Sequence, residues 1–353
     1  MSTLKVNGIQ AVSGTANAIS LTASDKTCTA NITNIQGRKN RIINGNFSVW
    51  QRGTSGFDTN DTFTADRWRM IESGGTGVVS RQTFTVGSEL AGSEYYLNYN
   101  VSTASDYTGL KYRIENIKTI EPGTWTISFW AKHTSAGPNG GLIIRGDQNF
   151  GSGGSGGVSL TSPAAITTTT SWVRYSKNVT IPSISGKTVG ASSYLQLEIG
   201  QGADAGTGAW NLDIANVQFE KGEVATDFEF SSFGDEFIRC QRYYQQIGTT
   251  TQDGDFCIGA SHLTSNGDQT RVGYFGQNNL RATPTITEFG SGLKVIGAAS
   301  KSYTDVTAIT DINVTFPSAY LQFNAECADI GDNYEIVVVT NLPNSGIKIE
   351  AEL

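Results

Sequence analysis

Alternation of apolar and polar residues in three segments constrains the fold of this chain more than any other feature. The segments are 124–131, 172–181 and 194–199. In an extended strand, successive side chains point to opposite faces, so each segment has one apolar face. Antiparallel strands of this kind pack as two sheets, and the sequence therefore predicts a β-sandwich. The residues expected to point into its core are Trp125, Ile127, Phe129, Ala131, Val173, Tyr175, Val179, Ile181, Leu195, Leu197 and Ile199.

The composition also favours an all-β fold. The 353 residues include 41 Gly but only 7 Pro, and 16% are charged. Such a mixture is typical of many short strands joined by turns. The length allows two or three domains. The formal net charge of -7 argues against nucleic-acid binding as the main function.

The four cysteines are scattered and include no C-x-x-C pair. Zinc ribbons and thioredoxin-like sites are therefore excluded. We expect free thiols in a protein that is assembled in a reducing cytosol, with a disulfide between Cys240 and Cys257 as the alternative. The first residues contain no apolar stretch of the kind found in signal peptides, so none is expected.

Four short motifs follow one another in a definite order. They are Asn40-Arg-Ile-Ile-Asn-Gly-Asn-Phe-Ser-Val-Trp-Gln-Arg52, Thr64-Ala-Asp-Arg-Trp68, Ala215-Asn-Val-Gln-Phe-Glu-Lys-Gly-Glu-Val-Ala-Thr-Asp-Phe-Glu229 and Cys240-Gln-Arg-Tyr-Tyr244. Together they resemble a jelly-roll, carbohydrate-binding-like domain found in tail-fibre and virion-surface proteins of bacteriophages. The resemblance covers residues 40–232 and implies that this segment is a jelly roll.

The chain is expected to have four parts. Residues 1–39 are small and polar, with no aromatic residue, and cannot bury enough surface to fold alone. They resemble the extended N-terminal attachment segments of phage fibres, which gain order by trimerising or by docking onto a virion. A flexible leader is the alternative. Residues 40–232 form the jelly roll, and 233–246 a short connector helix, since Phe233, Phe237 and Cys240 recur at helical spacing. Residues 247–353 are expected to form a second, C-terminal β-sandwich that is distal and faces the receptor.

Several short segments are expected to be loops. Gly151–Gly157 is predicted to be a mobile loop because of its Gly and Ser content. Arg145-Gly-Asp147 matches an integrin-binding tripeptide and is expected in a hairpin loop. Gly186-Lys-Thr188 is expected to be a turn, since the earlier glycine of a phosphate-binding loop is missing. The polar loops Thr264–Gln269 and Gly331–Asn333 offer an alternative place for a receptor site.

The sequence provides few groups for catalysis. His133 and His262 lie in different predicted domains, so a Ser-His-Asp triad or a histidine metal cluster is hard to assemble. Carboxylate-only chemistry, as in glycosidases, stays open. Its candidates are Glu198, Asp204, Asp213 and Glu220, which nothing in the sequence pairs. We therefore expect that the protein is not an enzyme.

An oxygen-rich cluster at Asp58, Asn60, Asp61 and Asp66 has two interpretations. It would suit a hard cation, so a structural calcium ion is one, and a polar loop with Asx turns is the other. Carbohydrate-binding jelly rolls often hold calcium near the first and the last strand. In the last-strand region this chain has Ala215-Asn216, where that class commonly has an acidic residue, which argues against the ion. No other cofactor is expected.

A sugar site needs a flat aromatic face with polar groups around it. Trp130 falls on the polar side of its strand, opposite Trp125 and Phe129. We expect it to share one concave sheet face with the outward residues of neighbouring strands. Packing under a loop or in a trimer interface is the alternative for such aromatic side chains. The predicted glycan-binding residues are Trp130, Trp172, Arg174, Tyr194, Gln196 and Glu198.

The resemblance implies a structural virion protein, a tail fibre or spike that binds a host-surface glycan during adsorption. Its expected partners are two further copies in a homotrimer, other virion proteins bound through residues 1–39, and a host polysaccharide or lipopolysaccharide. Neither nucleic acid nor membrane insertion is expected. The expected location is the virion surface, after assembly in the host cytoplasm. A capsid head fibre or decoration protein is one alternative, and a polysaccharide-degrading enzyme is another.

Overall fold

The computed structural model describes most of residues 38–249 and three short strands before them. Within 38–249 the short segments left out are 89, 91, 105–106, 161 and 203–204. Beyond residue 249 it describes 256–263, 269–275, 280–290, 293–297, 303–315, 320–327, 335–340 and 345–353. The chain divides into two compact units, residues 1–40 and 41–353. Regular structure in the described residues is almost all strand, so the predicted all-β class is confirmed.

The N-terminal unit contains a small antiparallel sheet. Its strands are β1 (Gly8–Gln10), β2 (Asn17–Leu21) and β3 (Cys28–Ala30), in that order. The segment expected to be extended thus forms strands that pair with one another. Pairing satisfies the backbone N–H and C=O groups of such strands without a large core.

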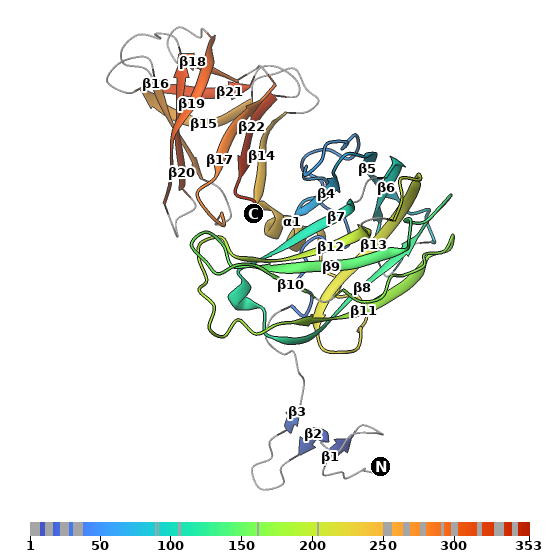
Figure 1. Ribbon diagram of the computed structural model, residues 1–353. Coiled ribbons are helices and arrows are strands. Elements are labelled where there is room, and N and C mark those ends of the chain that lie inside the picture. The colour runs from blue at the N-terminus through green and yellow to red at the C-terminus, as the bar shows by residue number, and fades with distance from the viewer. Residues whose placement is uncertain are drawn as a thin grey trace, which may run out of the picture. The chain divides into compact units, whose positions relative to one another are not determined.

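The first part of the second unit is a sandwich of two five-stranded antiparallel sheets (Figure 1). The first, here called the β12 sheet, has the order β10-β9-β12-β7-β4, and the second, the β13 sheet, has the order β11-β8-β13-β6-β5. The strands are β4 (Trp68–Glu72), β5 (Thr76–Thr83), β6 (Tyr95–Thr103), β7 (Thr108–Glu115), β8 (Gly123–Lys132), β9 (Leu142–Asn149), β10 (Val158–Ser159), β11 (Val173–Ile181), β12 (Tyr194–Gln201) and β13 (Trp210–Lys221). A short 3-10 helix (Ile117–Thr119) lies between β7 and β8.

The predicted alternation builds the core between these sheets. Side chains expected to point inward from β8, β11 and β12 are no more than 2% exposed: Trp125, Ile127, Phe129, Ala131, Val179, Ile181, Leu195, Leu197 and Ile199. Val173 is the exception at 36% exposure, because it is the first residue of an edge strand. Tyr175 is partly buried against the same core.

Two of the predicted loops are not free loops. Arg145-Gly-Asp147 lies inside β9, where Gly146 faces Leu197 of β12, so the predicted hairpin is wrong. A Cβ at Gly146 would lie 2.1 Å from the Gln196 carbonyl oxygen, which explains a glycine in mid-strand. The segment Gly151–Gly157, predicted to be mobile, is held by hydrogen bonds from Ser152 N to Ala191 O and from Ser155 N to Thr188 O, both 2.9 Å. The turn predicted at 186–188 is confirmed, since Gly186 has a φ of 74° in a turn.

The opening motif folds into a loop held by Asn44. Its side-chain oxygen accepts from Val49 N at 3.0 Å, while its amide nitrogen donates to Val49 O at 2.8 Å and to Asp66 O at 3.0 Å. The Trp68 indole N–H donates to the Asn44 carbonyl at 3.1 Å. Asp66 accepts from Gln51 N at 2.9 Å, and burial raises the pKa of its carboxyl. The first two motifs therefore stabilise each other.

The connector helix is shorter than predicted. Helix α1 (Phe233–Gln241) is capped at its N-terminus by Ser232, whose hydroxyl accepts from Asp235 N at 3.2 Å. Its Glu236 accepts from Asn44 N at 2.6 Å, which ties the helix to the opening motif. The chain turns after Gln241, and Tyr244 already begins β14 (Tyr244–Thr249), which pairs with β22 (Ser345–Glu350). Long-range strand pairing thus ends the helix before residue 246.

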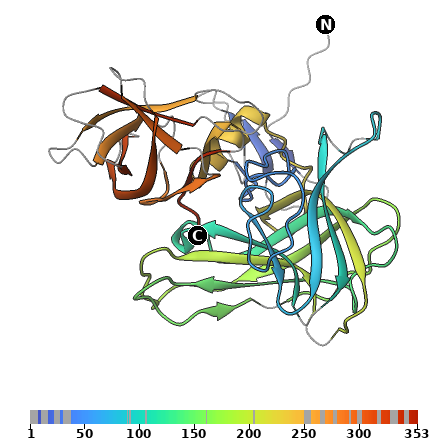
Figure 2. The ribbon, with the colours of Figure 1, turned by 90° about the horizontal axis from the view of Figure 1, so that it is seen from above.

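The C-terminal part contains two further antiparallel sheets (Figures 1 and 2, orange to red). One has the order β14-β22-β17, with β17 at Thr285–Phe289. The other is a closed barrel in the order β15-β16-β20-β19-β18-β21. Its strands are β15 (Phe256–Leu263), β16 (Gln269–Phe275), β18 (Leu293–Gly297), β19 (Tyr303–Thr315), β20 (Tyr320–Cys327) and β21 (Glu335–Thr340).

The expected two-sheet sandwich is therefore replaced here by a closed barrel beside a small sheet. Strand β19 carries two register shifts against β20, and such bulges bend a strand and help a sheet to close.

Residues 264–268 and 331–333 of the two proposed receptor loops lie outside the described residues. In the described part of the chain, no helix is long and apolar enough to cross a membrane.

Candidate functional site

The six predicted glycan-binding residues lie on two different sheets. Trp130 is on β8 and Arg174 is on β11, both strands of the β13 sheet. Trp172 comes directly before β11 and packs on Tyr96 of the same sheet. Tyr194, Gln196 and Glu198 are on β12, in the other sheet. The prediction of one shared concave face is therefore wrong. Alternation shows which side of a strand is polar, but not which sheet the strand joins.

Aromatic side chains gather on the outer face of the β13 sheet. Trp172 packs edge-to-face on Tyr96 of β6, with ring centres 5.2 Å apart, and lies 5.3 Å from the ring of Phe84. Phe84 and Tyr96 are 4.8 Å apart. On the same face, Trp130 is half-exposed between Arg174 of β11 and the small Ala215 of β13. We call Phe84, Tyr96, Trp130 and Trp172 the aromatic face.

The two tryptophans of this face differ from the other four in the hydrogen bonding of the indole N–H group. In the other four, the N–H group donates to an oxygen atom of the protein; these are Trp50 at 2.7 Å, Trp68 at 3.1 Å, Trp125 at 2.8 Å and Trp210 at 2.7 Å. Those side chains are also 8% exposed or less. Trp130 and Trp172 are half-exposed and donate no hydrogen bond to any described residue. Within the described structure, neither of these N–H groups is thus taken up by a protein acceptor.

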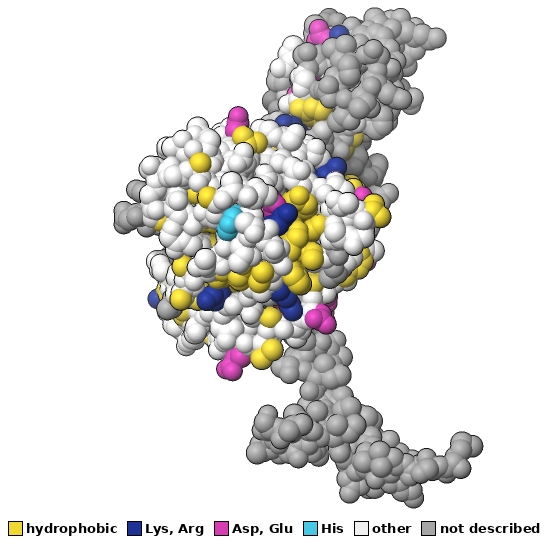
Figure 3. Space-filling view, turned by 90° about the vertical axis from the view of Figure 1, so that its right-hand side faces the viewer, with side chains coloured by type: hydrophobic (Ala, Val, Ile, Leu, Met, Phe, Trp, Pro, Cys, Tyr) yellow, Lys and Arg dark blue, Asp and Glu magenta, His cyan; other side chains and the backbone are white. Residues whose placement is uncertain are grey.

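Polar groups border the aromatic face. The carboxylate of Asp213 accepts from Asn98 Nδ2 at 2.6 Å and lies 3.5 Å from Lys132 Nζ, and burial raises its pKa. Lys132 also lies 5.2 Å from the centre of the Trp172 ring. Figure 3 shows a side of the molecule on which hydrophobic side chains form a band with Lys and Arg side chains along it.

The closing motif covers another part of the same sheet. Glu220 accepts from Thr226 N at 2.8 Å, and Gln218 accepts from Glu229 N at 2.7 Å, so residues 226–229 fold back over β13. Arg174 donates to the Thr226 carbonyl and lies 3.9 Å from the Asp227 carboxylate. The Arg174 guanidinium group therefore already has partners within the protein, unlike the indole N–H groups of Trp130 and Trp172.

The other three predicted residues form a hydrogen-bonded ladder across the β12 sheet. Glu198 is 7% exposed and accepts from Arg145 Nε at 2.6 Å and from Gln196 Nε2 at 2.7 Å. Gln196 accepts from Arg113 Nε at 2.9 Å, and Arg113 stacks 4.4 Å from the centre of the Tyr194 ring. These polar groups already have partners, so they stabilise the sheet more readily than they would hold a sugar.

The proposed calcium cluster is used by protein contacts. Asp61 forms ion pairs with Arg69, at 2.5 Å, and with Lys111. The side-chain oxygen of Asn60 accepts from Glu72 N at 2.7 Å, and that of Asp58 from the Thr59 hydroxyl at 3.3 Å. Two cations thus neutralise Asp61, and a polar loop describes this cluster better than an ion site. No group of three His, Cys, Asp or Glu residues suited to a metal occurs among the described residues.

The candidate catalytic groups do not come together in the described structure. Asp213 and Glu220 lie on β13 but Glu198 lies on β12, and Asp204 is outside the described residues. His133 Nδ1 lies 2.9 Å from the Thr168 hydroxyl. Cys240 is a free, buried thiol, and burial raises its pKa well above the ordinary value. Such a thiol is inert as a nucleophile.

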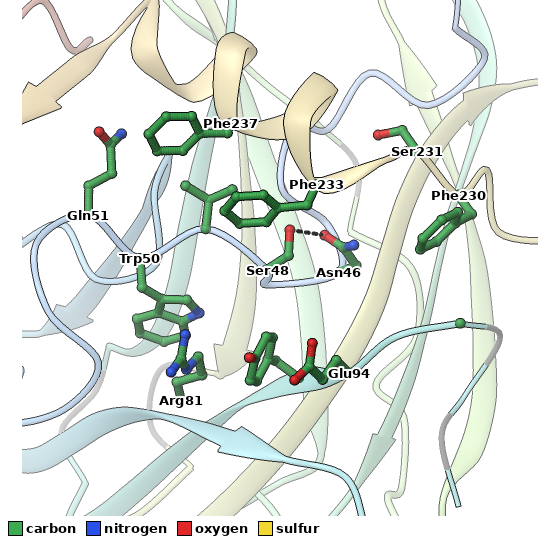
Figure 4. Close-up of a pocket in the computed structure, with 13 residues that line it drawn as sticks. Asn46, Ser48, Trp50, Gln51, Arg81, Glu94, Phe230, Ser231, Phe233 and Phe237 are labelled. Carbon is green, nitrogen blue, oxygen red and sulfur yellow. Dashed lines mark hydrogen bonds between the residues drawn. The ribbon is translucent and has the colours of Figure 1, made fainter. Parts of the chain in front are cut away.

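One cavity was not predicted from the sequence. It has a volume of about 520 Å³ and lies between the opening motif, the β5–β6 hairpin and α1 (Figure 4). The only hint in the sequence was Tyr95-Tyr96, a pair of adjacent aromatic residues that must point to opposite faces of a strand. The residues that line it include Asn46, Ser48, Trp50, Gln51, Arg81, Glu94, Tyr95, Phe230, Phe233 and Phe237.

No family model matches the chain, and no curated protein matches it. Among solved structures, the CBM22-1 xylan-binding domain of Paenibacillus barcinonensis Xyn10C is 15% identical, with a TM-score of 0.31, over 49% of this chain and 97% of that domain. The N-terminal cellulose-binding domain of Cellulomonas fimi β-1,4-glucanase C is 19% identical, with a TM-score of 0.27, over 49% of this chain and 99% of that domain.

A third similar structure is the enzymatically active domain of tailspike protein 4 of bacteriophage CBA120. It is 14% identical, with a TM-score of 0.29, over 52% of this chain and 21% of that one.

Proposed function

We propose that the sandwich binds a glycan through the aromatic face of the β13 sheet. The single observation that carries this proposal is the state of Trp130 and Trp172. They are the two tryptophans that are half-exposed and whose N–H groups have no partner among the described residues. An indole ring can pack on the C–H side of a pyranose while its N–H donates to a hydroxyl.

The border of the face supplies the polar groups that sugar hydroxyls need. Asn98, Lys132 and Asp213 form a network beside Trp172, with donors and acceptors held in place by one another. Hydroxyls both donate and accept hydrogen bonds, so a mixed border of this kind suits them. The face is a proposed binding surface rather than a catalytic one.

Substitution of the two tryptophans tests the proposal. We expect Trp130→Ala and Trp172→Ala each to weaken glycan binding at least tenfold on a glycan array or by titration calorimetry. Neither side chain belongs to the buried core, so both variants should stay folded, which a thermal melt checks. Val78→Ala is the matched control, since Val78 is a 42% exposed residue on β5 of the same sheet.

Two results would contradict this reading of the aromatic face. A sharp fall of the melting temperature in Trp130→Ala would show that the indole belongs to the core. A change of oligomeric state without any loss of glycan binding would assign the aromatic face to contacts between copies.

The wider setting that we propose is a virion fibre or spike that attaches a phage to a host polysaccharide or lipopolysaccharide. Its support is the order of the four motifs in residues 40–244. In this proposal, residues 1–39 attach to the particle and the chain acts as a homotrimer, whose repeated sites add avidity. Sedimentation of the intact chain tests the trimer. Electron microscopy of labelled particles tests the location, and label on capsid faces would favour a decoration protein instead.

A further inference from the structure

The cavity between the opening motif, the β5–β6 hairpin and α1 is separate from the aromatic face. Tyr95 lines the cavity, whereas the next residue, Tyr96, belongs to the aromatic face. Neighbouring residues of a strand point to opposite sides, so β6 contributes to both surfaces. A volume of about 520 Å³ falls within the range of roughly 300–1,000 Å³ that is common for small-ligand sites.

Aromatic rings form two walls of this cavity. Figure 4 shows Phe233 and Phe237 from α1 on one side, and Trp50 opposite them. The two phenylalanines stack with ring centres 5.7 Å apart. Phe233 is 59% exposed and Phe230, at the same cavity, is 56% exposed. Exposing such large rings to water is unfavourable, so a ligand that covers them would gain binding energy.

The polar groups of the cavity include one cation and one anion that do not pair with each other. Arg81 stacks 4.2 Å from the centre of the Tyr95 ring and forms no ion pair with a described residue. In contrast, Arg52, Arg67 and Arg145 are all paired with carboxylates. The Tyr95 hydroxyl bonds to Glu94, which raises the pKa of Tyr95.

Amide and hydroxyl groups complete the lining. Asn46 accepts from the Ser48 hydroxyl at 3.1 Å, drawn as the dashed line in Figure 4. The Asn46 amide nitrogen donates to no described residue. The cavity therefore presents free donors from Arg81 and Asn46 and an acceptor from Glu94, between aromatic walls.

From this arrangement we infer that the cavity is a second saccharide site, specific for neutral sugar units. A sugar ring would lie between the Phe233 and Trp50 walls, with Arg81 donating to its oxygens and Glu94 accepting from its hydroxyls. The charges of Arg81 and Glu94 cancel, and the chain has a formal net charge of -7, so acidic polysaccharides are disfavoured. The inference extends the proposed function, because it gives the sandwich two sites and a class of sugar.

The test uses the full chain carrying Trp130→Ala and Trp172→Ala, which removes the proposed site on the aromatic face. The probes are neutral gluco-, manno-, galacto- and xylo-oligosaccharides, with oligogalacturonate as the acidic probe, titrated by calorimetry. We expect this chain to keep one saccharide site per copy. Adding Phe233→Ala or Arg81→Gln should weaken the remaining binding at least tenfold.

Ile238→Ala is the matched control on the same helix. Ile238 is 53% exposed, similar to Phe233, but does not line the cavity. We expect it to bind as its parent does. Thermal melts of all variants exclude unfolding as the cause of any loss.

The outcomes separate the two proposals. The cavity site is overturned if Phe233→Ala and Arg81→Gln leave the binding unchanged, or if oligogalacturonate binds more tightly than every neutral probe. If the tryptophan substitutions change nothing in the parent chain but Phe233→Ala abolishes binding, the aromatic face is wrong and the cavity stands. If the unaltered chain binds no probe, both proposals fail.

Discussion

Arg67 shows how one side chain links distant parts of the chain. It is buried, forms an ion pair with Glu352, donates to the Arg113 carbonyl at 2.7 Å, and lies 3.5 Å from the centre of the Tyr243 ring. Both members of the ion pair are less than a tenth exposed. Removing Glu352 would leave Arg67 as a buried charge without a carboxylate, whereas removing Arg67 would leave Glu352 with Arg52 alone, at 3.5 Å.

We therefore predict that Glu352→Gln lowers the free energy of unfolding by about 3–5 kcal/mol, measured by urea denaturation, because Arg67 then keeps its charge without a carboxylate. Arg67→Met should also destabilise, but by less, because Arg52 still lies 3.5 Å from the Glu352 carboxylate. The double variant Arg67→Met with Glu352→Leu should cost less than the sum of the single changes. A loss below about 1 kcal/mol in both single variants, the range of an exposed pair, would show that the pair is not buried in solution.

On the aromatic face, one property of Trp130 could be predicted from the sequence and another could not. The outward position of Trp130 was predictable from alternation along its strand. The absence of a hydrogen-bond partner for its N–H group among the described residues was not predictable. Such a partner depends on which backbone carbonyl group the tertiary fold brings close to the indole. Trp125, five residues earlier, finds such a partner in the Glu121 carbonyl.

At the scale of secondary-structure elements, the β12 sheet depends on one pair of glycines. Gly200 of β12 lies directly opposite Gly109 of β7. A Cβ at Gly200 would lie 2.3 Å from the Thr108 carbonyl oxygen and 2.5 Å from the Gly109 Cα. Both neighbours are backbone atoms, so the strands themselves would have to separate.

We predict that Gly200→Ala destabilises the protein by about 1–3 kcal/mol, the usual cost of overpacking, as a lower thermal midpoint. Gly156→Ala is the matched control, because nothing lies within 4 Å of a Cβ there. Equal midpoints for the two variants would contradict the close approach of β7 and β12.

Two secondary-structure elements were predicted incorrectly from the sequence. The apolar spacing of 233–246 fits a helix, yet α1 ends at Gln241 because Tyr244–Thr249 pairs with β22, a strand about a hundred residues away. Arg145-Gly-Asp147 has the composition of a loop, yet it lies in β9 because Gly146 permits close contact with β12. Local composition cannot report such distant partners.

At the scale of the whole molecule, the last strand connects the C-terminal sheet with the sandwich. Ile349 of β22 is fully buried and faces Gln245 of β14 and Ile286 of β17. The neighbouring Glu350 lies 3.2 Å from Arg52 of the opening motif. Residues 41–353 form one compact unit, so we expect them to unfold together.

We predict that Ile349→Ala lowers the unfolding midpoint reported by tryptophan fluorescence, with a cost of about 2–5 kcal/mol. All six tryptophans lie between residues 50 and 210, so the signal comes from the sandwich alone. Lys348→Ala, at a half-exposed position on the same strand, should have little effect. An unchanged fluorescence midpoint, with a separate earlier transition by circular dichroism, would show that the two parts unfold independently.

The sequence by itself determined the all-β class, the core faces of β8, β11 and β12, and the outward position of Trp130. These follow from period-two alternation, which is a local property of an extended chain. Only the tertiary structure decided which strands share a sheet, and so divided the predicted sugar residues between two faces. It also decided which polar groups are already paired, and it built the cavity beside α1 from segments separated by almost two hundred residues. Sheet membership and cavities depend on contacts between distant residues, and no local pattern records them.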